Sequence, residues 1–379
     1  VINADALTLG DGGEVIVWAD GDTRFFGDIS ATGGSKLGDG GLVEVSGLEV
    51  LDFQGEVDTS ALNGEFGTTL LDPININVVA ADTPNPAKAG DGIWSVDEDR
   101  ENPTQAIGVG AINTLLRSSN LTLEASNDIT WNADATLNYE VTGADRTLDL
   151  RANNNIIFLN NQNQTTGPRI TPKEDGNTLP LNVILNSDRD GNNTGRIRLG
   201  NTIIKSNGGD ITLGGGANPS NEFSYGAESG IILSNTRLIS DGGDISLRGS
   251  GAQFAGVRLA NSSLIDSGNG RIFIEGQGTA QGGESSAAVN IGFTFDGTLS
   301  DSSTPQDIAS SNVSIISSNT NPDAITIVGR GPTEGDAVNV AGVAIQLNAG
   351  VLSVGEGGGM RIEGKGGVGV RGGAAAASR

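Results

Sequence analysis

Short runs in which apolar and polar residues alternate follow one another along most of this chain, and turn-forming residues separate them. The run GRIRLGNTIIKSNGGDITLGG begins at Gly195, and the run that begins at Ser229, SGIILSNTRLISDGGDISLRG, largely repeats it. A more divergent third copy begins at Ala255 and reads AGVRLANSSLIDSGNGRIFIEG. Alternation with period two predicts strands, and the clusters of Gly, Asn and Asp between them predict tight turns.

The copies lie about 26 to 35 residues apart, a spacing typical of solenoid repeats. Each repeat of a solenoid contacts only its neighbours. We therefore predict an all-β β-helix in which Ile211 and Ile245 lie at equivalent places in one thin apolar column. Asparagines in the turns at 126–128 and 153–155 are expected to hydrogen-bond from coil to coil.

The first 72 residues carry a repeat of their own. GGEVIVWADGDTRFFGDISATGG begins at Gly12, and GGLVEVSGLEVLDFQGEVDTSALNG begins at Gly40. A step of about 27 to 28 residues separates them, and either Phe25 or Phe26 is expected to stack on Phe53. The alignment matches three pairs of positions: Val15 with Val43, Phe26 with Phe53, and Ile29 with Val57.

Proline-, aspartate- and asparagine-rich segments interrupt the repeats, and they define the expected organisation of the chain. The run AINTLLR, from Ala111 to Arg117, is the expected short helix. We predict a first β-helix module at 1–81, an exposed loop with that helix at 82–118, coils at 119–194 interrupted by a polar loop near 160–180, the three-copy repeat at 195–278, later coils at 279–367 with a loop near 300–311, and a frayed tail or junction at 368–379.

Composition narrows the classes of protein that fit this pattern. The chain has 59 glycines and only 4% aromatic residues, which favours a narrow aliphatic core over a broad globular one. The glycines follow no Gly-X-Y period, which excludes collagen. A formal net charge of −24 argues against nucleic-acid partners, because phosphates would be repelled.

The chain has no cysteine and no histidine. It therefore lacks disulfides, thiolate chemistry and the commonest general base and metal ligand. A cysteine-free chain is also free to stay unfolded while it passes through a pore. No run reaches the roughly 18 apolar residues of a membrane span, and the strand-like first residues indicate a fragment of a longer protein.

Two acidic runs are the candidates for chemistry. Asp188 and Asp190 flank Arg189, and Asp97, Glu98, Asp99 and Arg100 follow one another. Clustered carboxylates are what glycosidic-bond cleavage requires, but both runs lie in predicted turns or loops, where Asp is expected for backbone reasons. We predict no catalytic residue, no enzyme activity and no cofactor, and name Asp97 and Asp99 as calcium candidates.

With these runs in view, the chain resembles the filamentous-haemagglutinin-like exoproteins of two-partner secretion (TpsA-type adhesins), in particular the long cyanobacterial members. Four runs carry the resemblance: GGEVIVWADGDTRFFGDISATGG, GGLVEVSGLEVLDFQGEVDTSALNGEFGTTLLDP, SSNLTLEASNDITW and LNVILNSDRDGNNTGRIRLGNTIIKSNGGDITLGGG.

The resemblance implies a right-handed parallel β-helix (solenoid) with extra-helical loops, exported through an outer-membrane secretion pore of the two-partner type. The chain would form part of the shaft of a secreted protein at the cell surface or in the extracellular matrix, with a structural or adhesive role. Its partners would be the pore, a surface receptor or glycan, and further copies stacked end to end. The alternative is a carbohydrate-active β-helix enzyme or tailspike-like depolymerase. A third hypothesis is a matrix filament that calcium stiffens.

Overall fold

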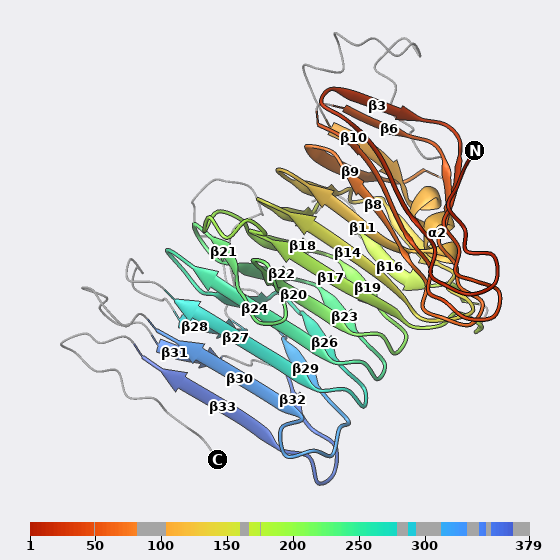
Figure 1. Ribbon diagram of the computed structural model, residues 1–379. Coiled ribbons are helices and arrows are strands. Elements are labelled where there is room, and N and C mark those ends of the chain that lie inside the picture. The colour runs from red at the N-terminus through yellow and green to blue at the C-terminus, as the bar shows by residue number, and fades with distance from the viewer. Residues whose placement is uncertain are drawn as a thin grey trace. The chain divides into compact units, whose positions relative to one another are not determined.

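The computed structural model describes residues 1–48, 50–81, 104–159, 167–174, 176–278, 287–292, 312–331, 341–345 and 350–366. Regular structure in these residues is almost entirely parallel β-strand, and the strands pair from one coil to the next (Figure 1). The prediction of an all-β parallel β-helix is therefore confirmed. The chain divides into two compact units, unit 1 (Val1–Ala152 and Arg169–Val183) and unit 2 (Asn153–Pro168 and Ile184–Arg379).

In unit 1, the first strand of each coil belongs to one sheet, and the later strands form shorter sheets. The first strands, in sheet order, are β2 (Glu14–Ala19), β5 (Leu42–Gly47), β8 (Thr68–Asp72), β11 (Asn120–Ala125) and β14 (Arg146–Ala152). The shorter sheets are β1 (Ile2–Asn3) with β4 (Asp28–Ser30) and β7 (Glu56–Asp58); β3 (Asp22–Phe25) with β6 (Val50–Phe53); β10 (Thr104–Gly108) with β9 (Asn75–Val79) and β12 (Ile129–Trp131); and β13 (Thr136–Tyr139) with β16 (Arg169–Pro172).

The register of these sheets gives the length of a coil. Val15 pairs with Val43 and Val43 with Thr69, steps of 28 and 26 residues. Ile29 pairs with Val57, as predicted.

The predicted match of Phe26 with Phe53 is wrong, because Phe25 is the residue that pairs with Phe53. The two rings stack with their centroids 6.1 Å apart, whereas Phe26 is exposed. Successive side chains of a strand point to opposite faces, so only one of the two phenylalanines at the end of β3 can lie over Phe53.

Residues 104–118, predicted to belong to an exposed loop with a short helix, are packed into unit 1 as strand β10 and helix α2 (Val109–Ser118). Strand β10 pairs in parallel with β9. Helix α2 contacts both β7 and β13, so it occupies the place of the third strand in its coil. Its buried residues recur with the period of a helix, not of a strand: Ala111, Ile112, Leu115 and Leu116.

Unit 2 is more regular, with three sheets that each take one strand from a coil. The first sheet is β20 (Ile211–Gly215), β24 (Ile245–Gly251), β27 (Ile272–Gly278), β30 (Ile325–Arg330) and β33 (Met360–Lys365), with β21 (Ser224–Gly226) also on β24. The second is β15 (Ile156–Phe158), β18 (Ile197–Gly200), β22 (Ile231–Ser234), β25 (Val257–Ala260), β28 (Ala287–Ile291) and β31 (Ala341–Ile345). The third is β19 (Ile203–Lys205), β23 (Arg237–Ile239), β26 (Leu264–Asp266), β29 (Ser314–Ile316) and β32 (Leu352–Ser353), while β17 (Leu181–Ser187) crosses the boundary between the units.

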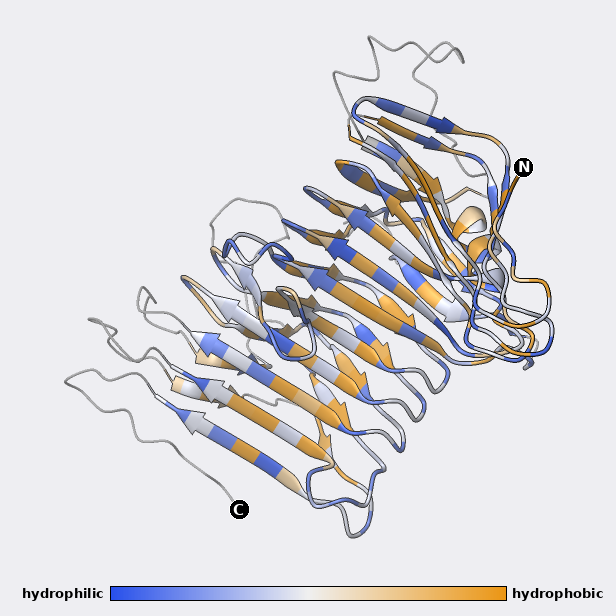
Figure 2. Cartoon of the chain, in the orientation of Figure 1, coloured by the Kyte–Doolittle hydropathy of each residue, from blue (hydrophilic) through white to orange (hydrophobic). Residues whose placement is uncertain are grey.

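The core of unit 2 is a set of aliphatic columns. Ile211 pairs with Ile245, as predicted, and the column continues through Ile272 and Ile325. All four side chains are fully buried, and Figure 2 shows apolar and polar residues alternating along the strands. Each coil thus buries its apolar face only against its neighbours, which is the energetic basis of a solenoid.

The turns of unit 2 also repeat. Asn201, Asn235 and Asn261 have φ angles of 51°, 49° and 50°, the left-handed region that asparagine tolerates better than most residues. The side-chain amide Nδ2 of Asn235 donates to Asn201 Oδ1 at 2.5 Å. In unit 1, Asn127 Nδ2 donates to Asn75 Oδ1 at 2.9 Å. Asparagines therefore hydrogen-bond from coil to coil at turns in both units.

Three other predicted segments are the polar loop near 160–180, the loop near 300–311 and the C-terminal tail. The polar loop predicted near 160–180 contains strand β16, which pairs with β13. The loop near 300–311 and the tail at 368–379 lie outside the described residues. In the part of the chain that is described, no helix is both long and apolar enough to cross a membrane.

Candidate functional site

The calcium candidates Asp97 and Asp99, and with them the acidic run 97–100, lie outside the described residues. Among the residues that are described, no group of three or more Asp or Glu side chains is arranged to hold a metal ion.

Asp188 and Asp190, the other acidic candidates, accept hydrogen bonds within the turn to which they belong. Asp188 has a φ of 51° and is buried, and its Oδ1 accepts a hydrogen bond from the backbone N–H of Thr194 at 3.1 Å. Asp190 Oδ2 accepts from the Asn192 side chain at 2.7 Å. Burial raises the pKa of the Asp188 carboxyl, and the nearby charge of Asp190 acts in the same direction. These contacts fit the expectation that both aspartates stabilise a turn.

Many other turn carboxylates and amides have a structural use that the sequence did not reveal. Asp11 Oδ1 accepts the backbone N–H of Asp39 at 2.8 Å, and Asp39 Oδ1 accepts the N–H of Glu65 at 2.8 Å. In unit 2, Asp210 Oδ1 accepts the N–H of Asp244, and Asp244 Oδ1 accepts that of Arg271, both at 2.7 Å. In each bond, the acceptor lies one coil before the donor. We call this arrangement the turn ladder.

Further members of the turn ladder follow the same direction. Asparagine side chains supply the acceptor for the backbone N–H of a residue in the next coil. They join Asn75 to Asp128, Asn113 to Glu140, Asn120 to Thr147, and Asn155 to Arg196.

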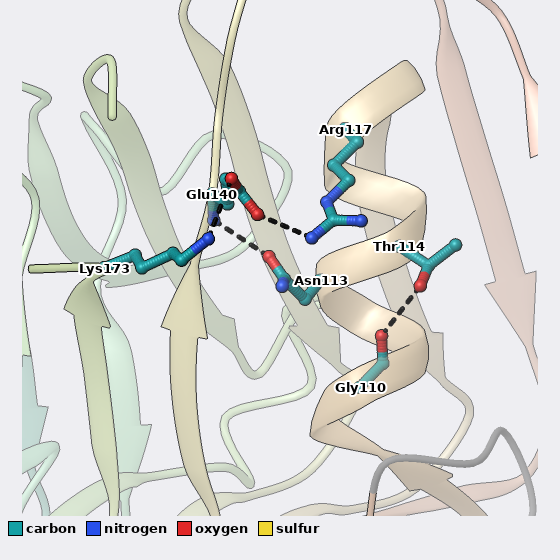
Figure 3. A network of polar contacts seen from close by, with 6 residues as sticks. All are labelled: Gly110, Asn113, Thr114, Arg117, Glu140 and Lys173. Atoms are coloured by element: carbon teal, nitrogen blue, oxygen red, sulfur yellow. Dashed lines mark hydrogen bonds and ion pairs between the residues drawn. The ribbon is translucent and has the colours of Figure 1, made fainter. Parts of the chain in front are cut away.

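A charged network connects α2 to the two coils that follow it (Figure 3). Glu140, just after β13, accepts from Arg117 Nη2 at 2.6 Å and from Lys173 Nζ at 3.0 Å. The hydrogen bond from Lys173 lowers the pKa of the Glu140 carboxyl, and that from Arg117 adds to the effect. The three side chains lie at the surface, so the network positions the helix without enclosing a site.

Arg146 lies beneath that surface and is buried. Its guanidinium carbon lies 3.2 Å from the ring centroid of Phe66. Nη1 donates to the carbonyl oxygen of Ala144 at 2.7 Å, and Nη2 donates to those of Arg117 at 3.2 Å and Thr142 at 3.1 Å. Burial lowers the pKa of Arg146 to about 10, which leaves it charged at neutral pH. A cation beside the last carbonyls of α2 also suits the negative end of the helix dipole.

The outward face of the first sheet in unit 2 carries a second ionic cluster. Glu275, on β27, binds Arg248 of β24 and accepts from Arg330 Nε of β30 at 2.9 Å. The guanidinium carbon of Arg248 lies 4.2 Å from the ring centroid of Phe273, and its Nε donates to the carbonyl oxygen of Ser220 at 2.6 Å. This cluster combines charged side chains with an aromatic ring on the outward side of neighbouring strands, so it is the strongest candidate for ligand binding in the described residues.

Sequence reasoning missed this cluster, although the signal was present. Arg248 and Glu275 are 27 residues apart, which is the length of one coil, and the register places them side by side. No family model matches the chain, and no curated protein matches it.

Proposed function

We propose that this chain is part of the β-helical shaft of a secreted surface exoprotein of the filamentous-haemagglutinin-like kind, with a structural and adhesive role. The observation that carries the proposal is the in-register stacking of coils around aliphatic columns such as Ile211, Ile245, Ile272 and Ile325. Such a stack gains length by adding coils, because each coil needs only its neighbours. A shaft needs this property for its length, whereas a β-helical enzyme would share the stack and would also need a pair of catalytic carboxylates.

The way polar residues are used supports the same role. Asp188, Asp190 and the aspartates of the turn ladder accept hydrogen bonds from backbone N–H groups. Carboxylates that are committed to the backbone stiffen turns and are poorly placed to transfer protons to a substrate. A net charge of −24 keeps a secreted surface soluble.

The proposed route of export is an outer-membrane pore of the two-partner type. A chain without cysteine cannot form disulfides before it reaches such a pore. Folding would then follow emergence at the cell surface, and the folded coils would remain at the surface or in the extracellular matrix.

An engineered crosslink tests this route. Thr212 and Ser246 are directly paired on neighbouring strands, so the double change Thr212→Cys and Ser246→Cys would join two coils by a disulfide. The chain would be fused behind the secretion domain of a known two-partner exoprotein and expressed with its pore. We expect the unmodified chain and the single variant Thr212→Cys to reach the medium, and the double variant to be retained until reductant is added. Retention of the unmodified chain would refute the proposed route.

A second measurement separates the shaft from the carbohydrate-active enzyme. The purified chain would be incubated with neutral and acidic polysaccharides, and new reducing ends or unsaturated products would be quantified. We expect no product above a heat-unfolded control. Product formation that depends on the folded chain would replace the proposed shaft with a depolymerase.

A further inference from the structure

The first three coils of unit 1 have long turns at the corner that leads into the first strands β2, β5 and β8 (Figure 1). The turns of unit 2 that lead into β20, β24 and β27 are about half as long. In chain order, the three turns of unit 1 are residues 4–13, 31–41 and 59–67, and the three of unit 2 are 206–210, 240–244 and 267–271. The short form is sufficient to close a coil, so the additional residues of unit 1 are available for another role.

Four leucines of these long turns are exposed to solvent. The exposed fractions are 88% for Leu7, 67% for Leu9, 63% for Leu37 and 77% for Leu62. A parallel bridge pairs Leu9 with Leu37 of the next coil, and the carbonyl oxygen of Leu7 accepts from Ser35 Oγ at 3.1 Å. We call the four leucine side chains the leucine corner. Single exposed leucines are common on protein surfaces, but a group of them on adjacent turns marks an interaction surface.

The backbone of the leucine corner is ordered by contacts between coils. Asn63 Nδ2, beside Leu62, donates to the carbonyl oxygen of Ser35 at 3.1 Å. A Cβ at Gly38 would overlap the carbonyl oxygen of Gly10. Backbone atoms of successive turns thus occupy the inside of this corner, which leaves the leucine side chains on its outside. Because the turns are ordered in advance, less entropy is lost when a partner docks on them.

A row of carboxylates runs beside the leucine corner. Asp11 and Asp39 each lie two residues after a leucine of the corner, and Glu65 follows them in the turn ladder. All three residues are exposed, and Lys36 is the only basic residue of the three turns. Residues 1–67 contain 13 acidic and 2 basic residues, a net charge of −11, which is nearly half of the −24 of the whole chain. A partner that covers the leucines must therefore be apolar on one side and positively charged beside it.

From this arrangement we propose that the leucine corner docks a cationic amphipathic helix of a partner polypeptide. The apolar stripe of the helix would cover the leucines, while its lysines or arginines would face the carboxylate row. A second copy of this chain would bring its own acidic row against the corner, and an anionic bilayer would be repelled by the carboxylates. The inference goes beyond the proposed shaft function and does not rest on it, so either can fail alone.

Two double variants of the full chain test the role of the leucines. Leu9→Ser with Leu37→Ser removes two side chains of the leucine corner. Leu48→Ser with Leu159→Ser removes two leucines that are 52% and 41% exposed elsewhere in the chain. The probe is a fluorescein-labelled helix of about 18 residues, with leucines on one face and lysines on the other. Fluorescence anisotropy measures its binding, and circular dichroism checks that each variant is folded.

We expect the Leu/Lys helix to bind the unmodified chain. Its affinity should fall about tenfold or more for Leu9→Ser with Leu37→Ser, because two buried leucines are lost from the interface. Leu48→Ser with Leu159→Ser should bind like the unmodified chain. A Ser/Lys peptide of the same charge should bind far more weakly, and so should a Leu/Glu helix with the same apolar face and the opposite charge.

The role of the carboxylate row is tested by substitutions that keep the turn ladder. Asp11→Asn with Asp39→Asn removes two charges but leaves side-chain oxygens that can accept the same N–H groups. Asp210→Asn with Asp244→Asn is the matched control, since these aspartates have the same place in the turn ladder of unit 2. The first pair should weaken binding at low salt and flatten its salt dependence. The second pair should change both far less.

Several results would overturn the proposal. Absence of binding would remove this class of partner, and equal losses in the two leucine variants would place the helix elsewhere. Binding of the Ser/Lys peptide as tight as that of the Leu/Lys helix would reduce the interaction to net charge. A dimer of the unmodified chain in light scattering that Leu9→Ser with Leu37→Ser abolishes would assign the corner to a second copy. Tighter binding to phosphatidylcholine vesicles than to the helix, lost in the same variant, would assign it to a bilayer.

Discussion

Unit 1 and unit 2 use the same parallel coils but complete them differently. In unit 2, the third strand is present in coil after coil, and similar turn residues recur at Asn201, Asn235 and Asn261. In unit 1, helix α2 takes the place of one third strand, and a buried arginine, Arg146, caps it. Where coils repeat, the same kinds of contact recur from one coil to the next. The coil that α2 interrupts needs contacts that the other coils do not supply.

The difference predicts where each unit is vulnerable. The interrupted coil depends on a few unique contacts, so single changes there should have large effects. The repeated coils divide their stability among many equivalent contacts, and the cost of a change should follow its burial. Tryptophan fluorescence reports on unit 1, because all three tryptophans of the sequence (Trp18, Trp94 and Trp131) fall within Val1–Ala152. Hydrogen exchange of separate peptides reports on unit 2.

The largest effect is expected at the interruption. Arg146→Ala would leave the carbonyl oxygens of Arg117 and Thr142 without their donor and would empty the space beside Phe66. The free energy of unfolding of unit 1 should fall by about 4 kcal/mol. Urea unfolding followed by tryptophan fluorescence measures this. Arg151→Ala, which removes a more exposed arginine of the same strand, should cost less than about 1 kcal/mol; equal losses would contradict the special role of Arg146.

A core position in the repeated unit comes next. Ile245→Ala would open a cavity in a column where Ile211 and Ile272 lie directly above and below. The expected loss is about 3 kcal/mol, confined to unit 2. Exchange of peptides from β20, β24 and β27 should quicken while tryptophan fluorescence keeps its midpoint. Ser246→Ala, on the outward side of the same strand, is the matched control, and a similar effect there would argue against the column.

A smaller effect is expected at the repeated turn. Asn235→Ala would force a Cβ-bearing residue without a polar side chain into the left-handed region and would remove the hydrogen bond to Asn201. The expected cost is about 1 to 2 kcal/mol. Asn235→Gly should recover most of the backbone part of that cost, since glycine adopts positive φ readily. Peptide-resolved exchange in urea would measure both, and an Ala variant as stable as Gly would remove the backbone explanation.

The smallest effect concerns pH, and it should have opposite signs in the two units. The pKa of Glu140 in unit 1 is lowered, so its stabilisation is present above its ordinary value near 4.5 and is lost as pH falls through the folded pKa. The pKa of Asp188 in unit 2 is raised, so its contribution is largest below its ordinary value near 3.8 and is lost as pH rises through the folded pKa.

Two isosteric variants separate these contributions. Glu140→Gln should flatten the acid-side loss of stability in unit 1, and Asp188→Asn should flatten the opposite trend in unit 2. Exchange rates of the two regions as a function of pH would test this, and the same sign in both units would contradict it.

The sequence predicted the repeated strands and the short helix at 111–117, but not every register position and not where that helix packs. Ile211 and Ile245 could be aligned because their surroundings are nearly identical, and strand pairing followed that alignment. Phe25 and Phe26 could not be separated, because two adjacent phenylalanines at a strand end fit either face. Strand β10 and helix α2 have no counterpart in other coils, so no alignment could place them inside the stack.

The polar clusters were harder to predict than the strands, because their members lie far apart in the sequence. Arg146 meets the carbonyl oxygen of Arg117, and Arg248 meets Glu275, across 29 and 27 residues of sequence. Such pairs become visible only when the coil length is known. Pairing opposite charges one coil apart would then have found Arg248 with Glu275, but the carbonyl cage around Arg146 has no sequence signal.

The turn ladder runs in one direction along the chain, which would matter if the chain folds as it emerges N-terminus first. Its side-chain acceptors lie one coil earlier than the N–H groups they bind, as from Asp11 to Asp39 and from Asp210 to Asp244. In a chain that emerges N-terminus first, the side-chain oxygen of each such bond would therefore be in place before the backbone N–H that donates to it. If the chain folds as it is exported, each finished coil would act as a template for the next, and each newly docked turn would oppose backward slippage.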